Sequence, residues 1–118
     1  MNFKDFLTSQ GRRKLRIEWN TKTLRERYAQ HEARMEAADK LQAIGTPEAI
    51  YGLARRFSAT SENLGIDQEE KRHVQDVLVG FGDKAIDPLK RYIKNHDQVT
   101  WSIDALKQLL PKERLIPI

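Results

Sequence analysis

Two stretches of this chain align with one another, and this internal repeat constrains the fold more than any other feature of the sequence. Residues 37–57 match residues 74–93 after a single one-residue gap at a shared glycine. The alignment pairs Leu41 with Leu78, Ile44 with Phe81, Gly45 with Gly82, Ile50 with Ile86, Leu53 with Leu89 and Phe57 with Ile93. In an incomplete third copy, WSIDALKQLLP, Leu106 takes the place of Leu78. A repeated unit of this length favours a stack of similar helical units.

Each copy predicts a helix, a turn centred on glycine, and a second helix. In the first copy we expect Gly45 to end a helix with a positive φ, Thr46 to cap the next helix, and Pro47 to occupy its first position. In the second copy Gly82 ends the helix, and residues 83–86 form a turn. Asp87 is then the expected cap, with Pro88 at the first helical position, because a deeper proline would delete a backbone hydrogen bond.

The segments before and between the copies predict one further helix and one loop. A stripe of residues at spacings of three and four predicts a single helix over 21–44, with Thr23 and Glu26 as a capping box near its start; the stripe is Leu24, Tyr28, His31, Met35, Ala38 and Leu41. Residues 58–67 are polar and predict a loop whose last residue, Asp67, caps the following helix.

The wording of the repeats resembles a known family. AIGTPEAIYGL and GFGDKAIDPL resemble the HEAT-like repeats first recognised in phycocyanobilin lyase subunits, and the longer stretch EEKRHVQDVLVGFGDKAIDPLKRYI looks like uncharacterised bacterial HEAT-repeat proteins. The resemblance covers roughly residues 36–110. It implies an all-α fold, a right-handed α-α superhelix of about two and a half helix pairs over residues 21–118. It also implies, as one alternative, an accessory subunit of a lyase-type enzyme that binds a tetrapyrrole.

The third copy lacks its second helix, because Pro111 and Pro117 bracket PKERLIPI too closely. A stacked helix needs a cover on its apolar side. That cover is expected from the chain's own last apolar residues, from a longer chain, from a second copy in a homo-oligomer, or from a partner; the chain's candidates are Leu115, Ile116 and Ile118.

Basic residues concentrate in the first part of the chain. Residues 1–30 hold eight basic and three acidic side chains, a balance of +5, whereas the remaining 88 residues sum to −1. We therefore expect residues 1–20 to form a basic, partly irregular N-terminal arm. Three interpretations of this arm stay open: a strand-like strap on the repeat domain with Leu15, Ile17 and Trp19 facing inward; a nucleic-acid or ribosome-binding element; and a membrane-surface element that inserts Phe3, Phe6 and Leu7. The expected polyanion-binding residues are Arg12, Arg13, Lys14, Arg16 and Trp19.

The signatures of catalytic chemistry are missing from the sequence. It has no cysteine, its six glycines are dispersed in turns, and its three histidines are isolated from one another. His31 is expected to be a core or boundary residue, and the carboxylates Glu69, Glu70 and Asp76 are expected on a solvated helix face. We therefore predict no catalytic residue, no metal site and no cofactor. The lack of cysteine favours a reducing compartment, so we expect a cytoplasmic protein, and no apolar run is long enough to span a membrane.

The second helix of each copy carries the predicted interaction surface. Ile50, Leu53, Ala54 and Phe57 in one copy, and Leu89, Tyr92 and Ile93 in the other, are expected to face the core. The residues left facing outward are mainly basic: Tyr51, Arg55, Arg56, Lys90, Arg91 and Lys94. This pattern predicts a non-enzymatic interaction module or small scaffold that binds a partner protein along this face, with Tyr51 as an anchor. Either an acidic protein segment or a nucleic-acid backbone would suit its basic residues.

Overall fold

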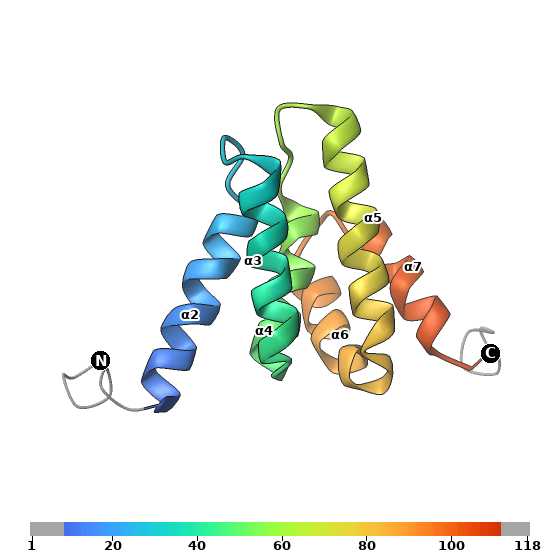
Figure 1. Ribbon diagram of the computed structural model, residues 1–118. Helices are drawn as coiled ribbons and strands as arrows, with labels where there is room; N and C mark the ends of the chain where they lie inside the picture. The colour runs from blue at the N-terminus through green and yellow to red at the C-terminus, as the bar shows by residue number, and fades with distance from the viewer. Residues whose placement is uncertain (1–8, 112–118) are drawn as a thin grey trace.

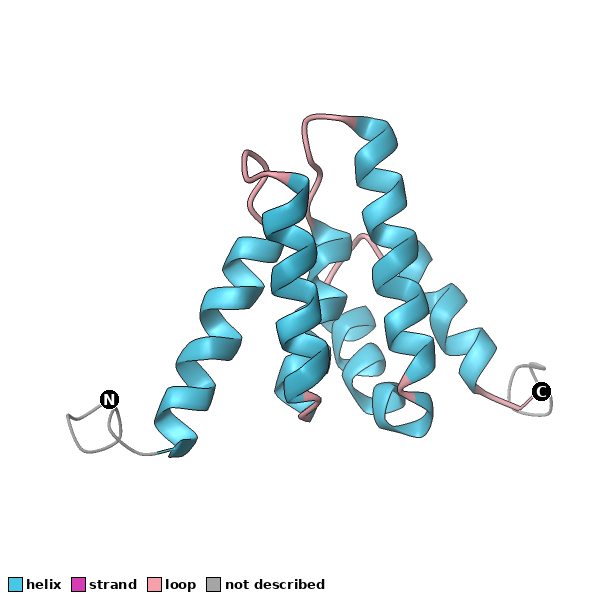
Figure 2. Cartoon of the chain, viewed as in Figure 1, coloured by secondary structure: helices cyan, strands magenta, loops and turns pink. Residues whose placement is uncertain are grey.

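The computed structural model describes residues 9–111, and within that range it contains α-helices and short 3₁₀ helices but no strand (Figures 1 and 2). The all-α prediction is therefore confirmed for the described residues. The elements are α2 (Ser9–Leu24), α3 (His31–Ile44), α4 (Pro47–Ala54), η1 (Arg55–Ser58), α5 (Leu64–Gly80), η2 (Gly82–Ala85), α6 (Ile86–Asn95) and α7 (Thr100–Leu109).

The turn between α3 and α4 forms as predicted. Gly45 adopts a φ of 63°, which glycine tolerates without steric cost, and its N–H donates to the carbonyl of Leu41 at 3.0 Å. The Thr46 hydroxyl accepts a hydrogen bond from the N–H of Ala49 at 3.3 Å, and Pro47 is the first residue of α4. The local sequence thus specifies the helix end, the cap and the next helix start.

The second glycine turn differs from the prediction. Gly82 has a φ of 65°, as expected, but it leads into η2, and α6 begins at Ile86 without a side-chain cap. The predictions of Asp87 as the cap and Pro88 as the first helical residue are therefore wrong. Pro88 is accommodated at the third position because the first four N–H groups of a helix have no partner inside the helix.

The predicted helix over 21–44 is two helices. The chain breaks between Leu24 and His31, and α2 extends back to Ser9, so a strand-like strap does not form in residues 9–24. The capping box is also wrong, because Thr23 lies in the last turn of α2. Arg34 stabilises the break by donating to the backbone carbonyls of residues 26, 27 and 29. A single buried side chain thereby satisfies backbone groups that a continuous helix would have satisfied itself.

The loop before α5 is shorter than predicted. Asn63, not Asp67, caps α5: its side-chain oxygen accepts from the N–H of Ile66 at 3.0 Å. Asp67 lies in the first turn of α5 and is buried.

The helices pack in two rows. In one row α3 contacts α5 and α5 contacts α7; in the other, α2 contacts α4 and α4 contacts α6. Figure 1 shows α2 at one end of the molecule and α7 at the other. α2 approaches α4 closely at Gly52, where an added Cβ would collide with the Thr21 hydroxyl.

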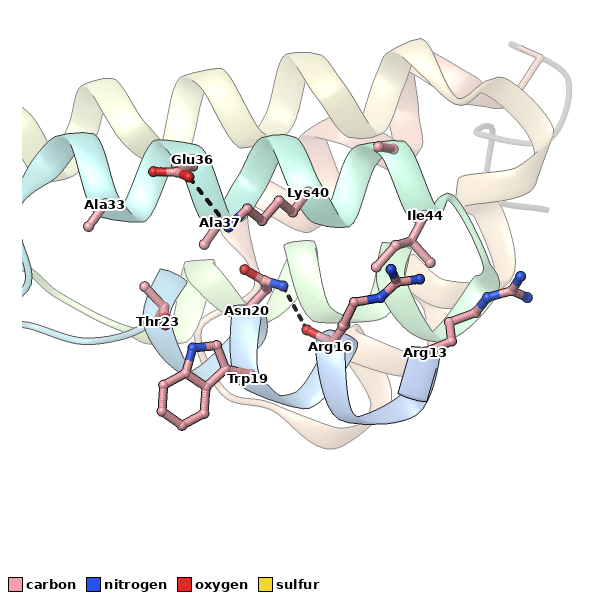
Figure 3. A pocket seen from close by; sticks show the side chains of 11 residues that line it. Arg13, Arg16, Trp19, Asn20, Thr23, Ala33, Glu36, Ala37, Lys40 and Ile44 are labelled. Atoms are coloured by element: carbon pink, nitrogen blue, oxygen red, sulfur yellow. Dashed lines mark hydrogen bonds and ion pairs between the residues drawn. The ribbon is translucent and has the colours of Figure 1, made fainter. Parts of the chain in front are cut away.

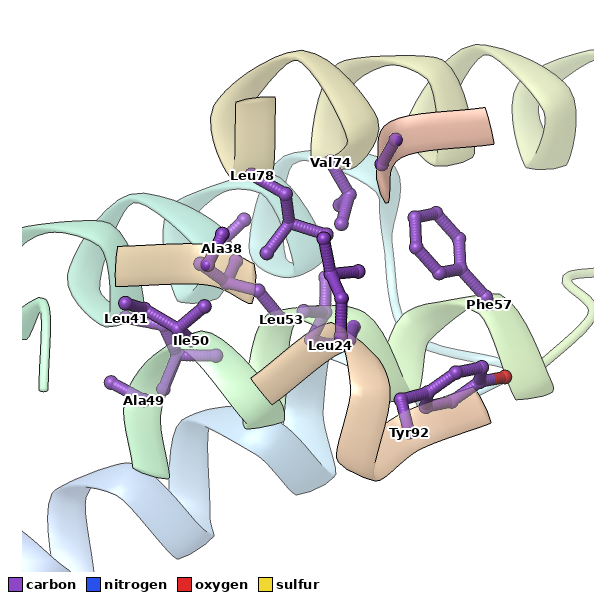
Figure 4. Packing of buried hydrophobic residues seen from close by; sticks show 14 of the residues in the cluster. Leu24, Ala38, Leu41, Ala49, Ile50, Leu53, Phe57, Val74, Leu78 and Tyr92 are labelled. Carbon is purple, nitrogen blue, oxygen red and sulfur yellow. The ribbon is translucent and has the colours of Figure 1, made fainter. Parts of the chain in front are cut away.

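The core lies between the two rows (Figure 4). Its largest buried side chains are Leu24, Leu41, Ile50, Leu53, Phe57, Leu78, Leu89 and Tyr92. The predicted inward positions are confirmed, except that Ile93 is only half-buried. Trp101 is half-buried and stacks on Phe57, with ring centroids 6.2 Å apart.

Several predictions fall on residues outside the described range. These are Phe3, Phe6 and Leu7 as membrane-inserting residues, and Leu115, Ile116 and Ile118 as a cover for the last helix. None of the helices in residues 9–111 is long and apolar enough to cross a bilayer.

Candidate interaction surfaces

The predicted basic surface follows the seam between α4 and α6. On α4, Glu48, Tyr51 and the following Arg55 recur at spacings of three and four, so they share one side of the chain. Arg91 of α6 joins this stripe: its guanidinium lies 3.0 Å from a Glu48 carboxylate oxygen and 3.9 Å from the centre of the Tyr51 ring. Tyr51 is therefore half-buried beneath Arg91, and it offers a partner less of its ring than the sequence suggested.

Of the other predicted residues of this surface, three are at least partly exposed and one is buried. Lys90 and Lys94 are exposed on α6, and Arg55 is half-buried at the start of η1. The prediction that Arg56 faces outward is wrong, because only 1% of the residue is exposed. The α-helix ends at Ala54, and the tighter turn of η1 carries Arg56 inward. Two buried carboxylates on α5 accept its hydrogen bonds there.

The partners of Arg56 belong to a buried ion network centred on Glu70. Glu70 is fully buried and accepts from Arg34 Nε at 2.7 Å and from Arg56 Nε at 3.2 Å, while His31 Nδ1 lies 2.7 Å from its second oxygen. The prediction of a solvated face thus fails for Glu70, although Glu69 and Asp76 are exposed as expected. Glu70 has two arginines close by in space that lie 36 and 14 residues away in sequence, so its neighbours in sequence gave no sign of them.

Asp67 forms the second centre of this network. Its carboxylate accepts from Arg56 Nη2 at 2.7 Å and from the N–H of Ser61 at 2.9 Å, and Lys71 Nζ lies 2.7 Å from its other oxygen. Burial alone would raise the pKa of Asp67, but hydrogen bonds from Lys71, Arg56 and Ser61 hold that pKa below its ordinary value. The network ties α3, η1, the loop before α5, and α5 into one unit.

The same balance sets the charge of Glu70. Burial favours a raised pKa, whereas hydrogen bonds from Arg34 and His31 and the charges of Arg34 and Arg56 lower the pKa below its ordinary value. A carboxylate with a lowered pKa and donors on both oxygens is a poor general base, because its lone pairs are occupied. No group of three or more potential metal-ligating side chains occurs among residues 9–111. The geometry of the network therefore indicates a structural role.

Arg25, which contacts Arg55, is a residue of the α4–α6 surface that sequence analysis missed. Arg25 follows α2, and its Nε donates to the carbonyl of Arg55 at 3.2 Å while its Nη2 donates to the Ser58 hydroxyl at 3.3 Å. Burial lowers the pKa of Arg25, and the positive charge of Arg55 lowers it further. Within the described part of the chain, neither Arg25 nor Arg55 forms an ion pair. No sequence signal places them together, because they are 30 residues apart.

A second candidate surface is a cleft of about 780 Å³ between α2 and α3 (Figure 3). It contains three of the five predicted polyanion-binding residues, Arg13, Arg16 and Trp19. Arg12 and Lys14 are exposed on α2 but do not line this cleft. Trp19 is 69% exposed, which is unusual for so large an apolar ring.

The comparisons with known proteins add nothing to this geometry, since no family model, no curated protein and no solved structure matches the chain.

Proposed function

We propose that this chain is a non-enzymatic interaction module built as a HEAT-like solenoid. The sequence repeat, the two glycines with positive φ at equivalent positions, and the two rows of alternating helices support this proposal. In a solenoid of this kind α4 and α6 are the second helices of successive repeats, α2 would be the second helix of a preceding repeat, and α7 the first helix of a following one.

The partner is an acidic protein segment that lies along the seam between α4 and α6. The observation that carries this proposal is the Arg25–Arg55 pair: the Arg25 guanidinium donates to the main-chain carbonyl of Arg55, and neither arginine forms an ion pair within residues 9–111. Lys90 and Lys94, on the neighbouring α6, are also exposed. Placing like charges together opposes folding unless an anion is bound, so a partner's carboxylate there relieves repulsion as well as forming hydrogen bonds. Arg91 is already paired with Glu48, so it contributes less.

A charge-reversal experiment tests this placement. Arg55→Glu combined with Lys90→Glu changes the surface by four charges, and we expect at least a tenfold loss of affinity for the partner because both attraction and steering are reversed. The matched control is Arg72→Glu with Lys84→Glu, which makes the same change at exposed positions on α5 and η2. The partner is recovered by affinity capture with nuclease at low and moderate salt, and its affinity for each variant is then measured by calorimetry.

The outcomes of that experiment are separable. Circular dichroism of both double variants should match the wild type, since none of the four side chains is buried. Equal affinity of the Arg55/Lys90 variant and the wild type, or an equal loss in the control, contradicts the proposed surface.

A nucleic-acid-binding role is the rival function, and one observation favours it. α2 presents four exposed basic residues within little more than one helical turn, namely Arg12, Arg13, Lys14 and Arg16. Binding by phosphate contacts alone would weaken steeply with salt, by about one power of concentration for each phosphate neutralised. Fluorescence anisotropy with a single-stranded oligonucleotide over a salt series distinguishes this role, because replacing the four residues by glutamine would then abolish binding.

A further inference from the structure

The cleft between α2 and α3 occupies a specific place in the two-row arrangement. α3 contacts both α4, the next helix of the other row, and α5, the next helix of its own row. The position before α3 in the row of α3, α5 and α7 would lie beside both α2 and α3. Among the described residues no helix occupies this position. We propose that this cleft receives an amphipathic helix of a partner protein, with small apolar residues toward α3 and acidic residues toward α2.

The α3 wall of the cleft is suited to a close helix contact. Ala33, Ala37 and Ile44 lie on this side at spacings of four and seven. The two alanines are small enough to let a neighbouring helix approach to the short end of the usual 8–10 Å range of interaxial distances, and Ile44 adds a larger apolar side chain at one end. The wall therefore selects an apolar stripe on the occupant.

The α2 wall is polar and basic. Arg13, Arg16, Asn20 and Thr23 follow one another at spacings of three, four and three, so they form one face of α2. Asn20 is only 8% exposed, and its amide nitrogen donates to the carbonyl of Arg16 at 2.8 Å (Figure 3). Arg13 and Arg16 form no ion pair within residues 9–111, so this wall selects carboxylates.

Trp19 supplies an anchor at the edge of the cleft (Figure 3). Its ring is largely exposed and lies 5.9 Å from the ammonium group of Lys22. Tryptophan is one of the residue types enriched among the few side chains that carry most of the binding energy in protein interfaces. A helix in the cleft would cover this ring.

The dimensions fit a short helix. The lining residues extend from Arg13 to Thr23 on α2 and from Ala33 to Ile44 on α3. At a rise of 1.5 Å per residue these walls are about 15 Å long, which corresponds to roughly three helical turns.

The apolar wall distinguishes a protein helix from a nucleic acid. A phosphate backbone needs positive charge and gains little from alanine methyl groups. Glu36 also lines the cleft, with its carboxylate 3.4 Å from Lys40 Nζ and most of its side chain exposed. Lys40 lines the cleft too, so this pair leaves the α3 wall without net charge and the positive charge of the cleft lies on α2, which is compatible with an occupant whose acidic residues face α2.

The test uses the full chain and a synthetic stapled helix of four turns, with leucine and alanine along one face and glutamate on one flank. Trp19 reports on binding, because covering its ring shifts its emission to shorter wavelength; Trp101→Phe removes the only other tryptophan. We expect saturable binding, and we expect Trp19→Ala (followed by calorimetry) and Arg16→Glu each to weaken it by roughly tenfold or more. The matched controls are Tyr28→Ala, which removes an aromatic ring that is 71% exposed outside the cleft, and Arg72→Glu. Each control should change the affinity by less than about twofold.

Four results overturn the proposal: a peptide with lysine in place of glutamate binds equally well; the peptide binds with undiminished affinity to Trp19→Ala; an oligonucleotide binds the cleft residues in place of the peptide; or light scattering shows a dimer that Trp19→Ala dissociates. The Arg55→Glu, Lys90→Glu double variant should bind the peptide like the wild type. Loss of the α4–α6 partner and loss of the cleft peptide are therefore independent outcomes.

Discussion

Removing the Glu70 carboxylate is the most severe test of how this fold is held together. Glu70→Ala leaves Arg34, which is 4% exposed, without its carboxylate, and it removes one of the two carboxylates that pair with Arg56. Breaking a buried ion pair by deleting one partner costs about 3–5 kcal/mol, chiefly because the remaining charge is desolvated and unpaired. A chain of this size has a total stability of roughly 5–15 kcal/mol, so the substitution removes a large share of it.

Urea denaturation followed by circular dichroism measures this loss. With a denaturant slope of roughly 1–3 kcal/mol per molar, the midpoint should fall by about 2 M. Glu69→Ala is the matched control, because Glu69 is the neighbouring residue of the same helix and is exposed; it should change the free energy of unfolding by less than about 0.5 kcal/mol. Glu70→Gln keeps the shape of the side chain and loses its charge, so its midpoint should lie between the other two.

A loss below about 1 kcal/mol for Glu70→Ala would refute this reasoning. It would mean that Arg34 is satisfied by its backbone carbonyl acceptors and that the carboxylate adds little.

Two further predictions concern helix contact and pH. Gly52→Ala should destabilise the fold by about 1–3 kcal/mol in thermal or urea unfolding, because the new methyl group collides with the Thr21 hydroxyl. The control Gly80→Ala, whose methyl group meets no atom within 4 Å, should be neutral or stabilising. Adding Thr21→Ala to Gly52→Ala should restore part of the lost stability. Asp67 and Glu70 have pKa values below those of the unfolded chain, so their contribution to stability is present above about pH 4 and is lost as the pH falls through their folded values. The urea midpoint should therefore decrease as the pH is lowered from 7 to 2.5, and it should decrease less steeply for Glu70→Gln than for the wild type. An equal dependence of the midpoint on pH in the two proteins would contradict the proposed linkage.

The features that sequence analysis predicted correctly are those specified by adjacent residues. Gly45 requires only its own conformational freedom, and Thr46 and Pro47 follow it directly, so the helix end, the cap and the new start can be recognised locally. The inward positions of Leu53 and Leu89 also follow from local periodicity, because each lies within an uninterrupted helix.

The features it missed depend on contacts between distant residues or on a change of helix type. Arg56 was placed outward by extending the period of α4, but the chain tightens into a 3₁₀ turn one residue earlier. Glu70 has ordinary charged neighbours, and only the fold brings Arg34 to it. In α2, Leu15, Ile17 and Trp19 alternate like a strand, yet Ile17 also shares a helical face with residues 21 and 24, which are buried against the other helices. Periodicity alone could not decide between these two patterns.

Arg55 and Arg56 are adjacent, and their different environments connect stability with the proposed function. Arg56 is fixed by Asp67, Glu70 and the carbonyl of Ala59, so the backbone of η1 is held on α5. The carbonyl of Arg55 and the Ser58 hydroxyl belong to that same turn, and they are the groups that accept hydrogen bonds from Arg25. The buried network therefore positions the Arg25–Arg55 pair: by pairing Arg56 inside the fold, it holds the carbonyl of the preceding residue, Arg55, where Arg25 donates to it. No carboxylate of the described residues forms an ion pair with Arg25 or Arg55. A surface that costs electrostatic repulsion in the free protein, and is held in place by buried ion pairs, is the arrangement expected where an anionic partner binds.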